Sequence, residues 1–326
     1  MTSVIIDCDP GLDDAIAILL AIKHLNVVGI TTVSGNESIE KVTTNALKVL
    51  ELGGATHIPV VRGSDRPLKR DPVYAPHFHG ESGMGGADLP APTKVPLEGH
   101  AVEFIIEVGM SASDLVLISI GPLTNIATAL RKEPRLRERV KLISMMGGSV
   151  TNGNVTPAAE FNVYHDAEAA DIVFRAKIPI FMAGLNLTGQ VLVGQKEIGV
   201  IRTINNGAAQ VVADLLNFYV TASERLGARG ASLHDPCAVM AVIEPDMIEF
   251  ESMHVVVETS GDHTYGMTVC ERRAGALGRR KDERSNSVWD EIDDQLSRPK
   301  QANVEVGVSI DRERFFFFLV ETLQRY

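Results

Sequence analysis

At 326 residues, 45% of them hydrophobic, the chain can bury a large core, and its formal net charge of −11 excludes nucleic acid as an expected partner. No apolar run reaches the roughly 20 residues that span a membrane, and the start MTSVIIDCDPG does not fit a signal peptide. Cys8, Cys237 and Cys270 lack metal-type spacing, so we expect reduced thiols in a cytoplasmic protein.

Residues 3–183 alternate between short apolar runs and segments with helical periodicity. The predicted strands are Ser3–Ile6, Val27–Val33, Ile58–Val61, Leu115–Ile120, Lys141–Met146 and Ile178–Ala183. The predicted helices between them are Asp14–Leu25, Ile39–Leu52, Leu123–Arg131 and Ala167–Ala176. Because the strand runs are almost continuously apolar, they suit a parallel sheet covered on both faces. This succession predicts a doubly wound α/β fold with a mostly parallel central sheet.

The carboxyl-terminal half of the chain has a different pattern. It contains predicted helices at Ile204–Arg225, His234–Val242 and Arg312–Arg325, and predicted strands at Met253–Glu258, Tyr265–Cys270 and Val304–Ile310. We therefore expect a smaller α+β part at this end. Since no repeat or linker divides the sequence, residues 1–326 are predicted to form a single domain.

Two segments interrupt the regular order. Residues 62–99 are rich in Pro, Gly and His and have no period, and such a long loop in a compact domain is usually functional or disordered. Residues 272–300 are densely charged and contain Trp289. The charge pattern predicts a solvated surface excursion there, with a short helix around Ser287–Leu296.

The strongest local signal is DCDPGLDD at residues 7–14. Asp7 and Asp9 end a predicted strand on the same face, and after a Pro-Gly turn Asp13 and Asp14 open a helix. In an open α/β sheet this turn lies at the edge where ligands bind. A helix amino terminus stabilises one carboxylate by about 0.3–1 kcal/mol, which does not suffice for three or four. The cluster therefore predicts a hard cation, Ca²⁺ or Mg²⁺; the alternative is Asp13 as a helix cap with solvated neighbours.

Polar residues also follow other predicted strands. Asn36 comes after the second strand, a GPLTN turn at residues 121–125 after the fourth, and a polar loop containing Asn154, Glu160 and Asn162 after the fifth. Together they would surround one sheet edge with groups that suit the hydroxyls of a sugar. The alternative is that these residues simply make turns and caps.

His234 and Asp235 precede Pro236 and an apolar helical run. Asp235 in that position could be an N-cap with Pro at the first helical position, which is a structural role. His234 is a residue that can donate a proton near neutral pH. From these residues alone, both interpretations stay open.

The motifs DCDPGLDDAIAILLA, TTVSGN, HGESGMGG, GPLTNIA, MMGG, AEFN and LHDPCAV, in that order, resemble the nucleoside hydrolase family of the inosine-uridine preferring type. The resemblance covers nearly the whole chain, and its aspartate motif and HDP element are specific in combination. It implies a calcium-dependent enzyme that hydrolyses the N-glycosidic bond of ribonucleosides to base and ribose in purine or pyrimidine salvage. It also implies a homo-oligomer, a dimer or a tetramer.

The resemblance implies roles for individual residues. Ca²⁺ would be bound by the side chains of Asp9, Asp14 and Asp235 and by the carbonyl of Thr124, with the attacking water and two ribose hydroxyls completing the shell. Asp9 would also act as the base toward that water, and His234 as the acid toward the leaving base. The predicted substrate contacts are Asp13 and Asn162 for the ribose diol, with Asn36 nearby, Asn154 and Glu160 for the 5′-hydroxyl, Met146 under the sugar ring, and His79 near the base.

Some features depart from the family pattern or fit other functions. Residues 223–233 do not present the Tyr and Arg that some purine-active relatives place over the base, so base preference stays open. The excursion at 272–300 exceeds the short basic turn expected there. An aspartate-nucleophile phosphatase is one alternative, but it would need a Ser or Thr after a middle strand and a later Lys. A non-catalytic nucleoside-binding protein is another, which the combination of the Asp cluster with His234 disfavours.

Overall fold

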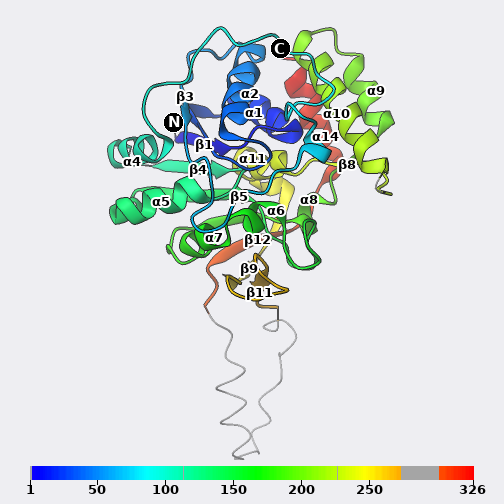
Figure 1. Cartoon of the computed structure of the whole chain (residues 1–326). Coiled ribbons are helices and arrows are strands. Elements are labelled where there is room, and N and C mark those ends of the chain that lie inside the picture. The colour runs from blue at the N-terminus through cyan, green and yellow to red at the C-terminus, as the bar shows by residue number, and fades with distance from the viewer. Residues whose placement is uncertain (1, 113, 226, 273–300) are drawn as a thin grey trace, which may run out of the picture.

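The computed structural model describes residues 2–112, 114–225, 227–272 and 301–326. Its centre is an eight-stranded sheet in the order β3-β2-β1-β4-β5-β6-β12-β9 (Figure 1). Neighbouring strands are parallel except β9, which pairs antiparallel with β12 at one edge. The strands are β1 (Ser3–Cys8), β2 (Asn26–Thr32), β3 (Val60–Arg62), β4 (Leu115–Ser119), β5 (Val140–Met146), β6 (Ile180–Ala183), β9 (Ile248–Met253) and β12 (Val304–Ile310). The predicted doubly wound, mostly parallel sheet is confirmed.

Helices cover both faces of the sheet. Successive side chains of a strand point to opposite faces, so a strand of apolar residues needs cover on both sides. In β1, Val4 and Ile6 join a core with α1, α2, α10, α11 and α14, whereas Ile5 joins a second core with α4, α5 and α7. The helices are α1 (Leu12–His24), α2 (Ile39–Leu52), α3 (Pro76–His79), α4 (Ala101–Ser111), α5 (Thr124–Lys132), α6 (Phe161–His165), α7 (Ala167–Phe174), α8 (Leu185–Thr188), α9 (Gln195–Arg202), α10 (Gly207–Arg225), α11 (Asp235–Ile243) and α14 (Arg312–Leu323).

The direction of strand addition reverses next to β1. From β1 the chain adds β2 and β3 on one side, and β4, β5 and β6 follow on the other side. A ligand crevice is expected outside the carboxyl ends of the strands at such a reversal. The turns after β1, β2 and β4, which carry the Asp motif, Asn36 and the GPLTN segment, meet at this point.

The carboxyl-terminal part is more closely tied to the main sheet than the sequence indicated. β12 has the predicted bounds and pairs with β6, and β9 extends the sheet beyond it. Apart from the sheet lies a two-stranded pair, β10 (Val255–Val257) and β11 (Thr268–Cys270), seen at the lower end of the body in Figure 1. The predicted excursion at 272–300, including the helix at Ser287–Leu296, lies outside the described residues apart from Arg272.

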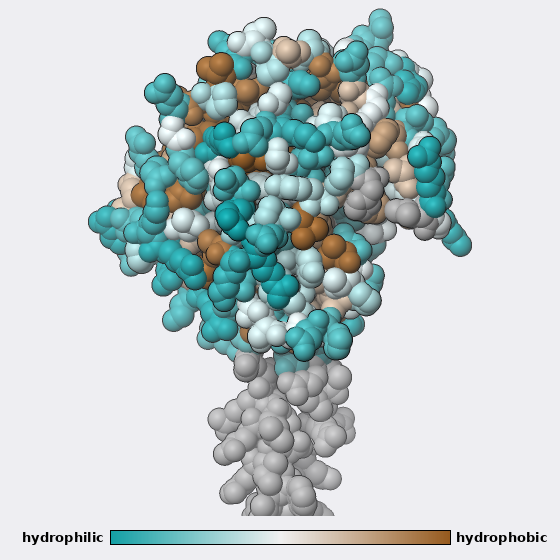
Figure 2. All heavy atoms as spheres, viewed as in Figure 1, coloured by the Kyte–Doolittle hydropathy of each residue, from teal (hydrophilic) through white to brown (hydrophobic). Residues whose placement is uncertain are grey.

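The surface is consistent with the charged composition. The face shown in Figure 2 is mostly hydrophilic, with small, separate hydrophobic areas. All three cysteines are free, and two of them, Cys8 and Cys237, are buried. Within the described residues, no helix combines the length and apolarity needed to cross a membrane.

Candidate active site

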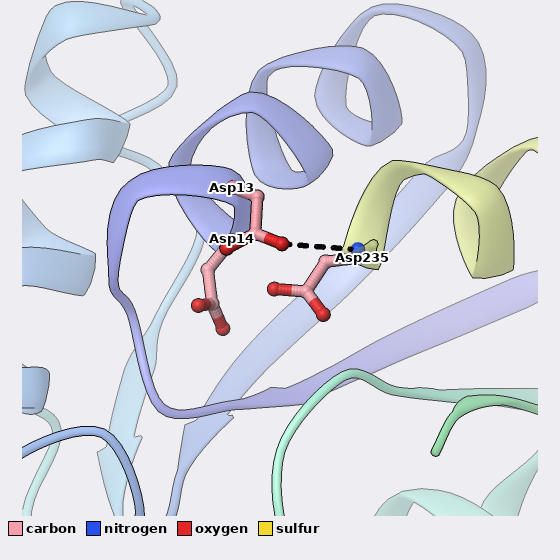
Figure 3. A group of neighbouring side chains, drawn as sticks. All are labelled: Asp13, Asp14 and Asp235. Carbon is pink, nitrogen blue, oxygen red and sulfur yellow. Dashed lines mark hydrogen bonds between the residues drawn. The ribbon is translucent and has the colours of Figure 1, made fainter. Parts of the chain in front are cut away.

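Three buried aspartates from two helix starts meet at the point where the strand order reverses. Asp13 and Asp14 lie in the first turn of α1, and Asp235 is the first residue of α11. Ligand oxygens of the three carboxylates lie within 4.8 Å of one another (Figure 3). Asp13 Oδ2 also accepts hydrogen bonds from the backbone N–H groups of His234 (3.2 Å) and Asp235 (3.4 Å). The cluster thus joins the amino-terminal ends of two packed helices.

The local sequence explains this geometry. Gly11 is the N-cap of α1, and Asp14 Oδ2 accepts from its backbone N–H at 2.9 Å. Asp14 Oδ1 accepts from the N–H of Asp9 at 3.3 Å, which closes the turn on itself. The alternative interpretation of Asp13 as the helix cap is therefore wrong, since that position belongs to Gly11. Asp235 is not a helix cap either, because the N-cap of α11 is His234 and Asp235 is the first residue of the helix.

Electrostatics favour a cation at this cluster. Burial, followed by the charge of Asp13, raises the pKa of Asp14 to about 7. Burial and the neighbouring aspartates raise the pKa of Asp9 and of Asp235 well above the usual range of a carboxyl group. A bound cation would reverse these shifts because it favours the ionised forms. An all-oxygen, buried carboxylate set fits a hard divalent ion.

Asp9 lies next to this cluster, between the turns that follow β2 and β4. Its Oδ2 accepts from the backbone N–H of Asn36 at 2.6 Å. A Cβ at Gly35 or Gly121 would come within 2.1 or 2.5 Å of the Asp9 carboxylate, so both glycines permit a close approach. The predicted carboxylate ligands of the metal were Asp9, Asp14 and Asp235. Within the described residues, the three carboxylates whose oxygens lie within 4.8 Å of one another are instead those of Asp13, Asp14 and Asp235.

Thr124, the predicted carbonyl ligand, is the first residue of α5. Its carbonyl oxygen accepts a hydrogen bond from the Thr128 hydroxyl at 2.8 Å. The Thr124 hydroxyl donates to Asp166 Oδ2 at 2.8 Å. The ligand role of Thr124 stays a prediction, as does that of Asp9.

A cavity of about 470 Å³ opens beside the cluster. Its wall contains every residue predicted to contact substrate, namely Asp13, Asn36, His79, Met146, Asn154, Glu160 and Asn162, together with His234 and Asp235. Asp9, Asp14 and Thr124 are not among the described residues of this wall. The structure therefore brings the predicted substrate residues together, while their individual roles stay predictions.

The wall residues after β5 are fixed by hydrogen bonds. Glu160 is the N-cap of α6, and its carboxylate accepts from the backbone N–H groups of Gly148, Asn162 and Val163 at 2.9–3.2 Å. Burial raises the pKa of Glu160 to about 7. Asn162 Nδ2 donates to the carbonyls of Ile120 and Met146, both at 3.2 Å. The capping interpretation of Glu160 is thus correct, and it coexists with a place on the cavity wall.

The two predicted histidines are both held through Nδ1. His234 Nδ1 lies 2.7 Å from the Thr188 hydroxyl oxygen, and burial lowers the pKa of His234 although the charge of Asp13 opposes this. His79 Nδ1 accepts from the backbone N–H of Leu12, at the start of α1, at 3.2 Å. Thr188 was not anticipated from the sequence, because a Thr at the end of a short helix gives no signal.

The sequence also did not reveal the wall that α10 contributes. Tyr219 and Ser223 of this helix line the cavity, and so do Ala228, Gly230 and Ser232 in the segment after it. The rings of Tyr219 and His79 have centroids 6.4 Å apart. Residues 223–233 lacked the expected Tyr, but the structure supplies one from the preceding turn. Within an apolar periodic helix, that Tyr could not be distinguished from a core residue.

Comparison with known proteins identifies the family of the chain. Residues 4–317 match the family model described as inosine-uridine preferring nucleoside hydrolase. The pyrimidine-specific ribonucleoside hydrolase RihA of Shewanella woodyi is 40% identical over 99% of this chain and 98% of its own length. Its namesake from Photobacterium profundum is 46% identical over 82% and 88%. A solved purine-preferring ribonucleoside hydrolase from Gardnerella vaginalis is 30% identical, with a TM-score of 0.87 over 99% of this chain and 98% of the other.

A doubly wound sheet with buried acids at its reversal point, beside a cavity of mixed polar and apolar lining, is consistent with an enzyme that hydrolyses sugar-like substrates. The chain belongs to the inosine-uridine preferring nucleoside hydrolase family. It is a ribonucleoside hydrolase that cleaves the N-glycosidic bond. The phosphatase and the non-catalytic binding protein, considered above as alternatives, are set aside by this assignment.

Proposed function

We propose that the chain binds one Ca²⁺ at the aspartate cluster and hydrolyses pyrimidine ribonucleosides to free base and ribose. The observation that carries the proposal is the group of three buried carboxylates, Asp13, Asp14 and Asp235, with ligand oxygens within 4.8 Å of one another, beside the 470 Å³ cavity that Asp13 and Asp235 line. Such a group favours a counter-charge, and a substrate in the cavity would lie beside it.

The side chains of Asp9, Asp14 and Asp235 and the carbonyl of Thr124 would hold the ion. Supporting this set, all three carboxyl groups are buried, burial raises the pKa of each, and the charge of Asp14 raises the pKa of Asp9 and of Asp235 further. When bound, Ca²⁺ supplies positive charge that acidifies a water molecule beside the sugar. Asp9 would accept a proton from that water as its oxygen forms a bond to the anomeric carbon.

The sugar-binding residues would stabilise the transition state. Asp13 and Asn162 would bind the ribose diol, with Asn36 nearby, while Met146 would lie under the ring. Asn154 and Glu160 would hold the 5′-hydroxyl. As the bond to the base breaks, its electron pair leaves with the base and positive charge develops on the sugar. The carboxylates that surround the sugar offset this charge.

His234 would protonate the leaving base. Burial lowers the pKa of His234, so the imidazolium is the minor form at neutral pH. We propose that this form, favoured by the neighbouring charge of Asp13, donates its Nε2 proton to the base as the bond breaks and returns to neutral imidazole. Thr188 fixes the orientation of the ring through Nδ1, which leaves Nε2 for the base. His79, held by Leu12, would contact the base from the other side.

The pyrimidine preference rests on the curated relatives, which are named pyrimidine-specific at 40% and 46% identity. The test is ribose release from uridine, cytidine, inosine, adenosine and guanosine by the purified chain. We expect kcat/KM for uridine and cytidine to exceed that for the purine nucleosides by at least about tenfold. Equal or greater values for inosine would contradict the preference. The predicted homo-oligomer, dimer or tetramer, is tested on the same sample by light scattering.

A further inference from the structure

Asp166, which the catalytic scheme does not use, has an unusual set of partners. It lies between α6 and α7, and its side chain is fully buried at 0% exposure. One oxygen, Oδ1, accepts from the backbone N–H of Ala169 at 3.0 Å and caps α7. The other, Oδ2, accepts from the backbone N–H of Leu68 at 2.9 Å and from the Thr124 hydroxyl at 2.8 Å. A helix cap needs only the first of these contacts.

The two partners of Oδ2 belong to different parts of the active site. Leu68 lies in the segment of residues 63–75. The last three residues of this segment, Val73, Tyr74 and Ala75, line the cavity. Thr124 is the proposed carbonyl ligand of the ion. One buried oxygen therefore joins a wall of the cavity to the residue that would complete the metal site.

A second buried side chain makes a parallel connection. Asn125 follows Thr124 in α5, and its Oδ1 accepts from the backbone N–H of Ser64 at 2.9 Å. Its Nδ2 donates to Asp7 Oδ1 at 2.8 Å and to the Thr32 carbonyl at 2.9 Å. A Cβ at Gly63 would come within 2.5 Å of the Asn125 amide. Asn125 is thus tied to the beginning of the 63–75 segment, and Thr124 is tied to its middle through Asp166.

We propose that Asp166 is a positioning residue, which orients Thr124 toward the bound cation and holds the 63–75 segment against the cavity. This inference rests on the proposed calcium site. Asp166 acts through Thr124 and Leu68, since the described wall of the cavity does not include it. Residues that orient metal ligands in this way typically change metal affinity by about 10–100-fold when they are replaced.

Two substitutions separate the contacts of Asp166. Asp166→Ala removes all three hydrogen bonds. Thr124→Val removes only the hydroxyl and keeps the backbone carbonyl, with nearly the same side-chain shape. A matched control is Asp311→Ala, because Asp311 caps α14 by accepting from the N–H of Arg314 at 3.0 Å. Both Asp→Ala variants lose a helix cap, but only Asp166→Ala also removes a hydrogen bond to Thr124, the proposed ligand residue.

The readout is Ca²⁺ affinity, measured by calorimetric titration of metal-free protein. We expect Asp166→Ala and Thr124→Val to weaken binding by about 10–100-fold, and Asp311→Ala to leave it unchanged. Both substitutions remove the hydrogen bond between the Thr124 hydroxyl and Asp166. The double variant should therefore bind Ca²⁺ no more weakly than the single variant that has the lower affinity. Amide exchange at Leu68 should accelerate in Asp166→Ala and not in Thr124→Val.

The outcomes distinguish this inference from the function on which it rests. If wild-type protein binds Ca²⁺ and folded Thr124→Val and Asp166→Ala bind it equally well, the positioning role is wrong and the calcium site stands. If wild-type protein hydrolyses uridine and binds no Ca²⁺, both the calcium site and the positioning role are wrong. If Asp166→Ala does not fold, Thr124→Val alone decides, since its substitution is nearly isosteric.

Discussion

Two regions of the cavity wall are built in different ways. The sheet-edge wall, which we define as Asp13, Met146, Glu160, Asn162 and Asp235, comes from strand ends and helix starts. Its polar atoms are held by backbone hydrogen bonds, three of them to Glu160 alone. The α10 wall, which we define as Tyr219, Ser223, Ala228, Gly230 and Ser232, consists mostly of small side chains on a helix and the segment after it.

We interpret this difference as a division between binding of the sugar and binding of the base. A site for a transition state needs donors and carboxylates held in fixed places, which the sheet-edge wall provides. The α10 wall can change side-chain size without disturbing those bonds. Related proteins of this fold are named pyrimidine-specific in one case and purine-preferring in another. We interpret the α10 wall as the part that can vary with the base.

The largest expected effect is at the acidic cluster. Asp14→Ala leaves Asp9 and Asp235 without a shared cation and should lower kcat/KM for ribose release by more than about 10³-fold, equivalent to about 4 kcal/mol. The loss should be the same for every base, because the change affects the sugar end. The control is Asp171→Ala, a carboxylate on α7 paired with Arg175. Near-normal turnover by Asp14→Ala after chelation would exclude the proposed site.

The next effect should depend on the leaving group. His234→Ala should reduce hydrolysis of uridine and inosine by about 10²–10⁴-fold, because a positioned proton donor typically contributes that much. Little change is expected with p-nitrophenyl riboside, whose phenolate leaves without protonation. Equal losses on all three substrates would instead indicate damage at the neighbouring Asp235. No loss on any of them would assign the proton to another group, with His79 the nearest candidate.

The sugar itself offers a test without any substitution. If Asp13, Asn162 and the ion all bind the diol, 2′-deoxyuridine leaves buried polar partners unsatisfied, at about 1–3 kcal/mol per neutral group. We expect its kcat/KM to be at least about 100-fold below that of uridine. Comparable values for the two nucleosides would mean that the sheet-edge wall does not recognise the diol.

A smaller effect concerns pH. Burial raises the pKa of Glu160 to about 7, so its carboxylate becomes ionised as pH rises through 7. The ionised form accepts hydrogen bonds from three backbone N–H groups, and we expect it to be the active form. The kcat/KM for uridine should therefore fall below pH 7, and Glu160→Gln should remove that decline. A decline that persists unchanged in Glu160→Gln would assign it to another group.

The regular elements were predictable where one pattern dominated. α2 and β12 have the predicted bounds, because an amphipathic helix and a short β-branched run each give a single strong period. α1 begins at Leu12, two residues before the prediction, since the turn after β1 is closed by Asp14 rather than by a cap at Asp13. β9 was missed because its IEFESM sequence alternates apolar and charged residues, as suits an edge strand.

The site was predictable only in part, for a physical reason. Acids at strand ends imply a cation site, because like charges cannot gather there unaided, and motif order assigned the remaining contacts. The contacts of Asp166 and Asn125 gave no such signal, because their partners Leu68 and Ser64 lie 98 and 61 residues away and offer only backbone N–H groups. Contacts between distant backbone and side chain leave no pattern in the sequence.

The most direct test of the account is a Ca²⁺ titration of chelator-treated wild-type protein, with uridine hydrolysis measured on the same samples. The buried carboxylate cluster predicts one Ca²⁺ per chain and activity that returns in proportion to the bound ion. Full turnover in protein that elemental analysis shows to be free of divalent metal would contradict it.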